Sequence, residues 1–356
     1  MAASYSISLV ARVPAFSGPP ALTELGGLVF ESVTYIDELN KAGSATVTCP
    51  IRSLHDTAKA RFRDLVANPC ELWIYRNSKL VWAGGVETIG LQQQNVVLGA
   101  VGLYGYVSRM GIMADYSPIG IDQFLIPKTM VDNWQARGRG HYGIDTSAVG
   151  TSGVVRTQTY LQKDLSGVAS KVEELSKMTN GFDIWVEPDT RRLRMASPQR
   201  GQDLSAKVFL DQRNIESASI AMSVAPGDLV TDASATGTSQ STTGESKAFW
   251  SSDINSAARL TFGASWAGQS FQDTPDQTSV NGKLTEFLKA RSTQLFQPGV
   301  SITPRAGADV GDFAAGDSIF YGYDAGLGYQ SGVFRTGKLT VTADKNGDEQ
   351  LGVEFV

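Results

Sequence analysis

The sequence contains few of the residues that a catalytic or metal site needs. It has only 2 His and 2 Cys among 356 residues. Serine and cysteine mechanisms use a histidine base beside a nucleophile and a carboxylate, and neither His55 nor His141 lies in such a setting. Cys49 and Cys70 lack metal-ligand spacing, although a single bond between them stays open. We therefore predict that the chain is not an enzyme and has no catalytic residue, metal or cofactor.

Long apolar runs and an excess of positive charge are missing as well. The longest apolar stretch, Val96 to Val107, contains three glycines and is shorter than the ~20 residues of a membrane helix. No basic segment precedes an apolar one at the start, so a secretory signal is not expected. The net charge of −5 argues against a large surface for duplex DNA. We expect synthesis in a host cytoplasm and no membrane insertion.

The residues that are present indicate an ordered chain rich in strands and turns. Hydrophobic residues make up 42% and charged residues 19%, with 37 Gly and 13 Pro. The length favours two or three packed units. We predict an α+β, mainly β fold, with two tube-like β-barrel or sandwich domains and a smaller helix-on-sheet middle domain. The predicted boundaries are 1–111, 112–215 and 216–356.

The first of these segments alternates apolar and polar residues in short stretches, which is typical of strands. The turn Asn77-Ser78 is expected to join two of them, and helical spacing predicts a crossing helix over Leu54 to Val66. The expected strands are Tyr5 to Val10, Leu28 to Tyr35, Ala45 to Cys49, Glu71 to Tyr75, Leu80 to Ala83 and Asn95 to Gly99.

The middle segment predicts helices and one small hairpin. Asp122 is a candidate cap for a helix that Pro127 would split or kink. Residues 137–153 are rich in glycine and are expected to form a surface loop. A second helix is predicted from an apolar stripe that runs from Leu165 to Leu175, with Asp164 as N-cap, followed by a hairpin from Phe182 to Met195.

The last segment mixes strands with one long helix. Residues 236–245 are polar and low in complexity, so we expect an exposed loop or hairpin tip. A helix is predicted over about 279–296, with Leu295 in its apolar stripe and Pro298-Gly299 at its end. Asn346-Gly347 is a strong signal for a terminal hairpin.

Two stretches near opposite ends of the chain share a layout. Leu72 to Leu91 and Asp317 to Thr342 each contain an aromatic strand, a turn, a second strand, a glycine and then an outward strand. The pattern predicts two similar β domains, although any two hairpins can look alike at this level.

The order of features resembles the minor tail or tail-hub proteins of long-tailed phages of actinobacteria, a group similar to the baseplate-hub family. The first segment that carries the likeness is Leu72 to Gly85, followed by Leu103 to Arg109. The later segments are the helix Leu165 to Met178, Asn180-Gly181-Phe182-Asp183-Ile184, Pro198-Gln199-Arg200-Gly201, the helix Leu284 to Phe296, Gly316-Asp317, Arg335-Thr336-Gly337-Lys338-Leu339 and Asn346-Gly347-Asp348.

The resemblance implies a homotrimer at the virion tail tip, in which three chains with two tube-like domains each form a pseudo-sixfold ring. Such a ring would join the sixfold tail tube to a threefold tip and form part of the DNA conduit, with DNA only in transit. The implied partners are the distal tail ring protein, the tape-measure protein and tip or fibre proteins. Assembly through strand edges would also cover exposed edges. Candidate interface residues are Trp73, Tyr75, Trp82, Phe320, Tyr321, Tyr323 and Phe334.

Two other classes of protein stay open. A hexameric distal tail protein would form a true sixfold ring, although the helical middle segment favours the hub. A carbohydrate-binding adhesin or wall hydrolase would need exposed Trp residues beside carboxylates, whereas the six Trp are scattered along the sequence.

Overall fold

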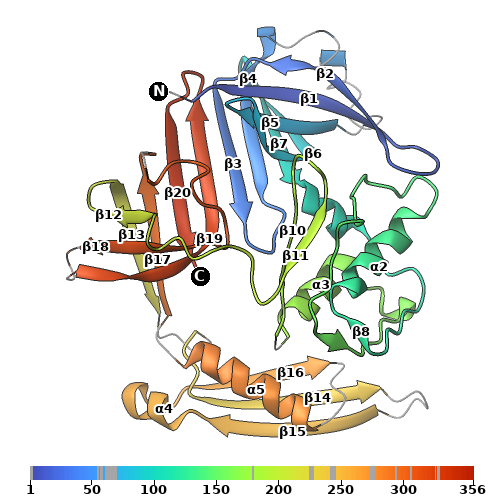
Figure 1. Ribbon diagram of the computed structural model, residues 1–356, viewed down its shortest axis with the longest axis vertical. Helices are drawn as coiled ribbons and strands as arrows, with labels where there is room; N and C mark the ends of the chain where they lie inside the picture. Colours follow the sequence, from blue (N-terminus) through green and yellow to red (C-terminus); the bar gives the residue numbers. More distant parts are fainter. Residues whose placement is uncertain are drawn as a thin grey trace. The chain divides into compact units, whose positions relative to one another are not determined.

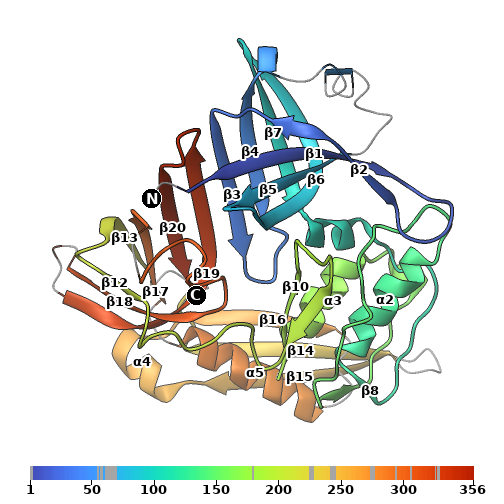
Figure 2. The ribbon, with the colours of Figure 1, turned by 45° about the horizontal axis from the view of Figure 1, so that its top comes forward.

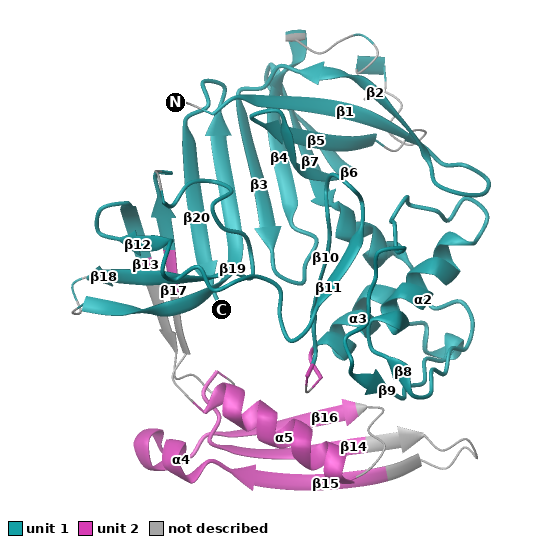
Figure 3. Ribbon diagram, in the orientation of Figure 1, with its two compact units in different colours: residues 1–176, 181–218, 300–356 teal, residues 177–180, 219–299 magenta. Residues whose placement is uncertain are grey.

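The computed structural model describes residues 3–53, 56, 59–60, 70–178, 180–223, 228–240, 246–272, 277–292, 295–304, 307–324, 326 and 329–356 (Figure 1). Contacts divide the chain into two compact units. The first comprises Met1–Ser176, Gly181–Ala218 and Val300–Val356, and the second comprises Lys177–Asn180 and Ser219–Gly299 (Figure 3). The boundaries near residues 111 and 215 remain predictions.

A 13-stranded sheet forms the centre of the first unit. Eleven of its strands follow the order β13-β17-β20-β19-β3-β4-β7-β6-β5-β1-β2, and β18 and β12 branch off from β19. The strands are β1 (Tyr5–Val13), β2 (Ala21–Leu28), β3 (Ser32–Glu38), β4 (Ser44–Pro50), β5 (Cys70–Arg76), β6 (Lys79–Gln92), β7 (Asn95–Gly102), β12 (Phe209–Asp211), β13 (Ile215–Ser223), β17 (Leu295–Ile302), β18 (Ser318–Asp324), β19 (Tyr329–Asp344) and β20 (Glu349–Phe355).

Strands from the two ends of the sequence share one core. Alternate residues of β3, β4 and β7 pack in the same buried cluster as those of β18, β19 and β20, among them Val47, Leu98, Ile319 and Val353. The prediction of an α+β, mainly β chain is confirmed. The described strands close no barrel. Strand β3 pairs with β19 and so joins the two halves into one sheet (Figure 2).

Helices and short strands fill the stretch between β7 and β12. They are η2 (Leu103–Arg109), β8 (Ile121–Asp122), α2 (Leu125–Gln135), β9 (Val155–Arg156), η3 (Gln162–Asp164), α3 (Val168–Ser176), β10 (Asp183–Val186) and β11 (Leu193–Ala196), after an earlier single turn η1 (Ile51–Ser53). The hairpin β10–β11 confirms the predicted return of the chain near Met195.

Two helix predictions in this stretch were wrong in detail. Pro127 neither splits nor kinks α2, because the helix begins at Leu125 and the proline lies in its first turn, where no N–H partner is required. Leu165 lies outside α3, with a left-handed backbone and 91% of its surface exposed. The residues just before α3 are held extended instead, since the N–H of Val168 donates to the carbonyl of Met110 and the N–H of Ile112 to that of Ser166.

The second unit is a three-stranded sheet with a helix on one face. Its order is β15 (Ser246–Ile254), β14 (Asp232–Gln240), β16 (Trp266–Gln272), with α4 (Ser256–Phe262) and α5 (Gln277–Arg291). Val280, Leu284 and Leu288 of α5 pack against Ala233 and Ala235 of β14. This apolar contact is the core of the unit.

Two sequence predictions for this region need correction. The long helix ends at Arg291 rather than near residue 296, and Leu295 begins strand β17, whose pairing in the large sheet overrides the helical pattern. The first half of the polar stretch 236–245 is strand β14 rather than loop, because it pairs with β15 on one side and β16 on the other.

Several predicted features have plain outcomes. His55 and most of the predicted helix over Leu54 to Val66 lie outside the described residues. No disulfide joins Cys49 and Cys70. None of the helices described is long and apolar enough to cross a membrane. The described part of the chain also contains no cluster of side chains suited to holding a metal ion.

Candidate assembly site

The two stretches that share a layout in the sequence form two closely similar hairpins. A seven-residue strand, β5 or β18, is followed by a much longer one, β6 or β19. In each short strand the same two positions point into the core: Leu72 and Ile74 in β5, Ile319 and Tyr321 in β18, all 0% exposed. The equivalence therefore extends to individual core positions.

Each long strand changes partner in its middle. β6 pairs with β5 as far as Gly85 and with β7 from Gly84 onward, and its register with β7 shifts between Val86 and Thr88. β19 pairs with β18 as far as Arg335 and with β20 beyond it, and the register shifts between Thr336 and Lys338. Such bulges increase the local twist and redirect a strand. The two meanders thus bend at the same place.

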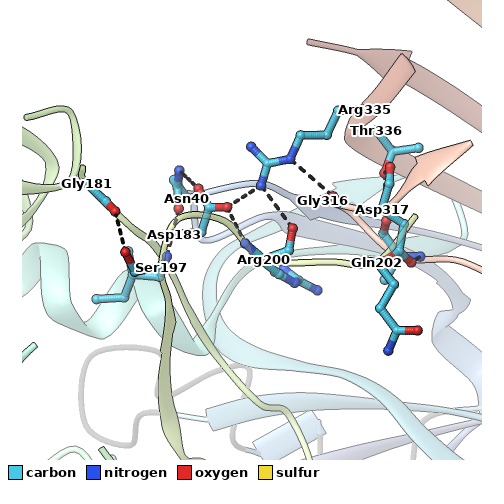
Figure 4. Close-up of polar contacts among 12 residues, drawn as sticks. Asn40, Gly181, Asp183, Ser197, Arg200, Gln202, Gly316, Asp317, Arg335 and Thr336 are labelled. Atoms are coloured by element: carbon cyan, nitrogen blue, oxygen red, sulfur yellow. Dashed lines mark hydrogen bonds and ion pairs between the residues drawn. The ribbon is translucent and has the colours of Figure 1, made fainter. Parts of the chain in front are cut away.

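A network of polar contacts surrounds Asp183 at the start of β10 (Figure 4). The side chain of Asn40 donates to Oδ1 of Asp183 at 2.7 Å, and the backbone N–H of Arg200 donates to Oδ2 at 2.6 Å. The guanidinium of Arg335 in β19 also bonds to Oδ2. In return, Oδ1 of Asn40 accepts the N–H of Ile184 at 2.8 Å. Three distant parts of the chain are therefore tied to one buried carboxylate.

The same network continues into the turn before β18. Nε of Arg335 donates to the carbonyl of Gly316 at 3.1 Å, and Oδ1 of Asp317 accepts the N–H of Gln202 at 2.7 Å. The hydroxyl of Thr336 donates to the carbonyl of Asp317 at 2.9 Å. Because these buried groups are all paired, the network can hold its segments in one arrangement.

Arg200 links this network to β3. Its guanidinium donates to both oxygens of Asp37, at 3.3 and 3.0 Å, and lies over the ring of Trp185, 4.9 Å from the centroid. A bidentate pair combined with stacking fixes the side chain more firmly than a single contact does.

A second buried ion pair joins the same β10–β11 hairpin to β5. Glu71 is 0% exposed, and Arg191 donates to its two oxygens at 2.8 and 3.1 Å. The hydroxyl of Tyr106 and the indole N–H of Trp73 also donate to Glu71, at 2.9 and 3.0 Å. Burial raises the pKa of Tyr106, and the nearby Glu71 adds to the shift. The phenol therefore stays a protonated donor.

These two ion pairs occupy equivalent places in the repeat. Glu71 is opposite Gly85 in the first hairpin, and Ser318 is opposite Arg335 in the second, at the last rung before each bulge. In the first repeat the charge is a fully buried acid on the short strand, whereas in the second it is a partly buried base on the long strand. Each charge reaches a partner of opposite sign in or beside the β10–β11 hairpin.

The chemistry of this arrangement is structural. The carboxylates are occupied by guanidinium, amide and hydroxyl donors, which leaves them no role as general acid or base. His141 accepts the N–H of Gly143 at Nδ1, 2.9 Å away, and burial lowers its pKa. This contact orients the ring within its own loop.

The predicted interface residues fall into three groups. Trp82 and Tyr321 are buried in the core of the chain, and Tyr323 and Phe334 pack against that core. The remaining three are half-buried and lie at outward positions of their strands: Trp73 and Tyr75 in β5, and Phe320 in β18. The assembly role of the whole set stays a prediction.

The charged residues of the two ion pairs, Arg335–Asp183 and Arg191–Glu71, were not predicted from the sequence. Asp183, Arg200 and Arg335 all lie in segments that carry the family resemblance, and the structure brings these segments together. A charged residue next to an apolar strand was the available signal in each case. The sequence could not reveal which charges meet.

The second unit carries a separate aromatic surface. Trp250 and Trp266 are 63% and 66% exposed, and they lie opposite Thr236 and Asp232, on the face of the sheet that α5 does not cover. The indole N–H of Trp266 donates to the hydroxyl of Ser234 at 3.3 Å. This face therefore shows two large apolar rings beside small polar groups.

Comparison with solved structures connects this architecture to known proteins. No protein-family model matches the chain, and no curated protein matches it. The 43 kDa tail protein of prophage MuSo2 from Shewanella oneidensis has a TM-score of 0.63 at 9% identity, with 99% of this chain and 98% of that chain covered. The chain has the fold of a prophage tail protein.

Two further tail proteins have the same fold over nearly their whole length. A tail protein from Neisseria meningitidis has a TM-score of 0.61 at 13% identity, covering 99% of this chain and 96% of that one. Prophage tail protein gp18 from Listeria monocytogenes has a TM-score of 0.56 at 11% identity, covering 98% and 94%. The likeness in fold therefore extends over nearly the whole of this chain.

Proposed function

We propose that this chain is a non-enzymatic structural subunit of a phage tail, located at the tail tip. Three copies form a pseudo-sixfold ring that joins a sixfold tail tube to a threefold tip and forms part of the DNA conduit. The observation that carries the proposal is the repeat of β5–β6–β7 as β18–β19–β20, with matched core positions and matched bulges. A chain with two similar domains is what a trimer needs in order to present six similar faces.

The tail-protein fold supports the same conclusion. We expect the ring to dock on the distal tail ring protein, to receive the end of the tape-measure protein and to anchor tip or fibre proteins. The net charge of −5 is compatible with DNA in transit, because a strongly basic conduit would retain the phosphate backbone.

The test is the mass of the purified chain in solution, measured by native mass spectrometry or light scattering, together with class-averaged images. We expect a trimer whose projections look sixfold. A true hexamer would favour the distal tail protein instead. A chain that stays monomeric, alone and when mixed with the neighbouring tail proteins, would contradict both forms of the proposal.

A second candidate function is carbohydrate binding. Trp250 and Trp266 are exposed on one face of the second unit, and exposed aromatic rings beside polar groups suit sugar rings. Titration with cell-wall polysaccharide, followed by tryptophan fluorescence, tests this candidate. A change that disappears in Trp266→Ala would support it, and an unchanged spectrum would exclude the tested polysaccharide.

A further inference from the structure

The second half of β19 lies inside the large sheet. From Lys338 to Asp344 it pairs with β20 on one side and with β3 on the other. The β3 ladder is antiparallel and runs from the Lys338–Glu38 pair to the Asp344–Ser32 pair. Both edges of this half-strand are therefore hydrogen-bonded.

The equivalent half of β6 has only one partner. Its ladder with β5 ends at Gly85, and from Thr88 to Gln92 it pairs with β7 alone. Within the described ranges, no strand pairs with the side of β6 that corresponds to the β3 side of β19. Residues Glu87, Thr88, Gly90, Leu91 and Gln92 are exposed in the single chain.

Strand order shows what kind of strand fits this edge. The sheet contains two series of four, β13-β17-β20-β19 and β3-β4-β7-β6, and each ends in one of the long strands. β3 begins the second series and covers the edge of β19. Its counterpart, β13, begins the first series and is the last strand of the sheet, so no described strand lies beside one of its edges.

Both open edges are chemically ready to pair. Val86 to Gln92 and the nine residues of β13 each contain a single Glu and no Lys, Arg or Pro. Proteins that keep an edge strand solvent-exposed usually protect it with such residues, because unpaired backbone groups recruit other strands. Strand β2, at the other end of the sheet, has the same composition, so composition permits pairing at these edges, and the repeat is what selects β6 and β13.

We infer that β13 of one subunit adds antiparallel to the Thr88–Gln92 edge of β6 in the next subunit, as β3 adds to β19 within the chain. The contact joins two different edges, so it is head-to-tail and can close a ring without a twofold axis. The pairing itself follows from the repeat, whereas the number of copies in the ring rests on the proposed function.

Disulfide trapping in the full-length chain tests the pairing. Cysteine is introduced on β13 by Glu216→Cys or Ser217→Cys, which cover both faces, and on β6 by Thr88→Cys, Gly90→Cys or Gln92→Cys. Mild oxidation should link some double variants into dimers and trimers on a non-reducing gel. The matching single variants, which keep Cys49 and Cys70, should not form these species.

The outcomes separate the pairing from the proposed function. A trimer by native mass with no cross-link in any combination would overturn the strand pairing and leave the trimeric hub intact. A chain that is monomeric under all conditions tested would overturn the hub. Cross-linked species that grow beyond three copies would support the pairing and contradict the trimer.

An edge variant provides a second readout that does not depend on oxidation. At Gly90 an added Cβ would meet no atom closer than 3.9 Å, so Gly90→Lys should fold normally. A lysine on the edge should raise the concentration of half-dissociation about tenfold or more. The control is Thr23→Lys on β2, the terminal strand at the other end of the sheet, which should leave the trimer unchanged. Equal effects of the two substitutions would argue against the pairing.

Discussion

The long strands β6 and β19 have the same design and different surroundings. Each completes a hairpin with a short strand, bulges and then pairs with a third strand. Beyond the bulge, β19 is covered by β3, and Val341 is 4% exposed, whereas the equivalent residue of β6, Leu91, is 75% exposed. In one repeat the chain itself supplies the neighbouring strand, whereas in the other no described strand pairs with this side, which is the edge that the proposed contact would cover.

The two repeats also attach differently to the hairpin between them. The first uses a fully buried acid, Glu71, and the second uses a partly buried base, Arg335, at the same rung. Glu71 pairs with Arg191 and Arg335 pairs with Asp183. Because Glu71 and Arg335 differ in sign, neither can pair with the other's partner. Substitutions at matched positions can therefore show how equivalent the repeats are.

The largest effect is expected at the first attachment. Arg191→Met should leave the carboxylate of Glu71 buried without its ionic partner and lower the free energy of unfolding by about 3 to 5 kcal/mol. Urea unfolding followed by tryptophan fluorescence measures the loss. The control is Arg213→Met, which breaks the exposed pair with Asp211 and should cost about 0.5 kcal/mol or less. Similar losses for the two variants would contradict a structural role for the buried pair.

Matched core positions should respond alike. Leu72→Ala and Ile319→Ala each remove a fully buried side chain one residue after the last rung before the bulge and should each cost about 3 kcal/mol. The same unfolding measurement checks both variants. If only one of them is destabilised, the packing of the two repeats is less equivalent than the strand geometry indicates.

The second attachment should tolerate substitution better than the first. The side chains of Arg335 and Asp183 are 21% and 7% exposed, against 13% and 0% for Arg191 and Glu71, so water can replace more of the lost interaction after Arg335→Met. We therefore expect a loss of about 2 kcal/mol. The ranking against Arg191→Met, measured under identical conditions, is the informative quantity. A larger loss at Arg335 than at Arg191 would reverse the proposed order of the two attachments.

The smallest effect is expected at the open edge. Leu91→Ser should change the free energy of unfolding of the isolated chain by about 0.5 kcal/mol or less, because the side chain is exposed. Val341→Ser at the equivalent buried position should cost about 2 kcal/mol or more. Equal losses measured for the monomers would mean that the exposed half of β6 is already covered in solution.

Strands were easier to predict than helix ends. Alternation located β4 and β7 well, because the side chains of a half-buried strand follow a period of two wherever the strand pairs. Strand β1 was also located, although six consecutive residues, Ile7 to Arg12, are buried in it. The helix around Leu165 and the end of α5 were misplaced, since contacts with distant residues decided whether an apolar residue continued the helix or left it. Local periodicity contains no information about those contacts.

The candidate site was predictable only in outline. The likeness of the two hairpins was visible in the sequence, and the structure extends it to matched core residues and bulges. The ion pairs of Asp183 and Glu71 were not predictable, because their partners lie 152 and 120 positions away. Many charged residues could have satisfied each of them.

The sequence by itself determined that this chain folds mainly as strands, through its alternating residues and its turn signals, which act over a few neighbours. It also determined that two stretches far apart in the chain would adopt similar hairpins. Only the tertiary structure decided that β3 joins those hairpins into one sheet and that, among the described strands, none lies beside one edge of β6 or of β13. The physical reason is that strand pairing depends on backbone hydrogen bonds, which nearly every residue type can make, so register and partner are settled by packing across the whole fold.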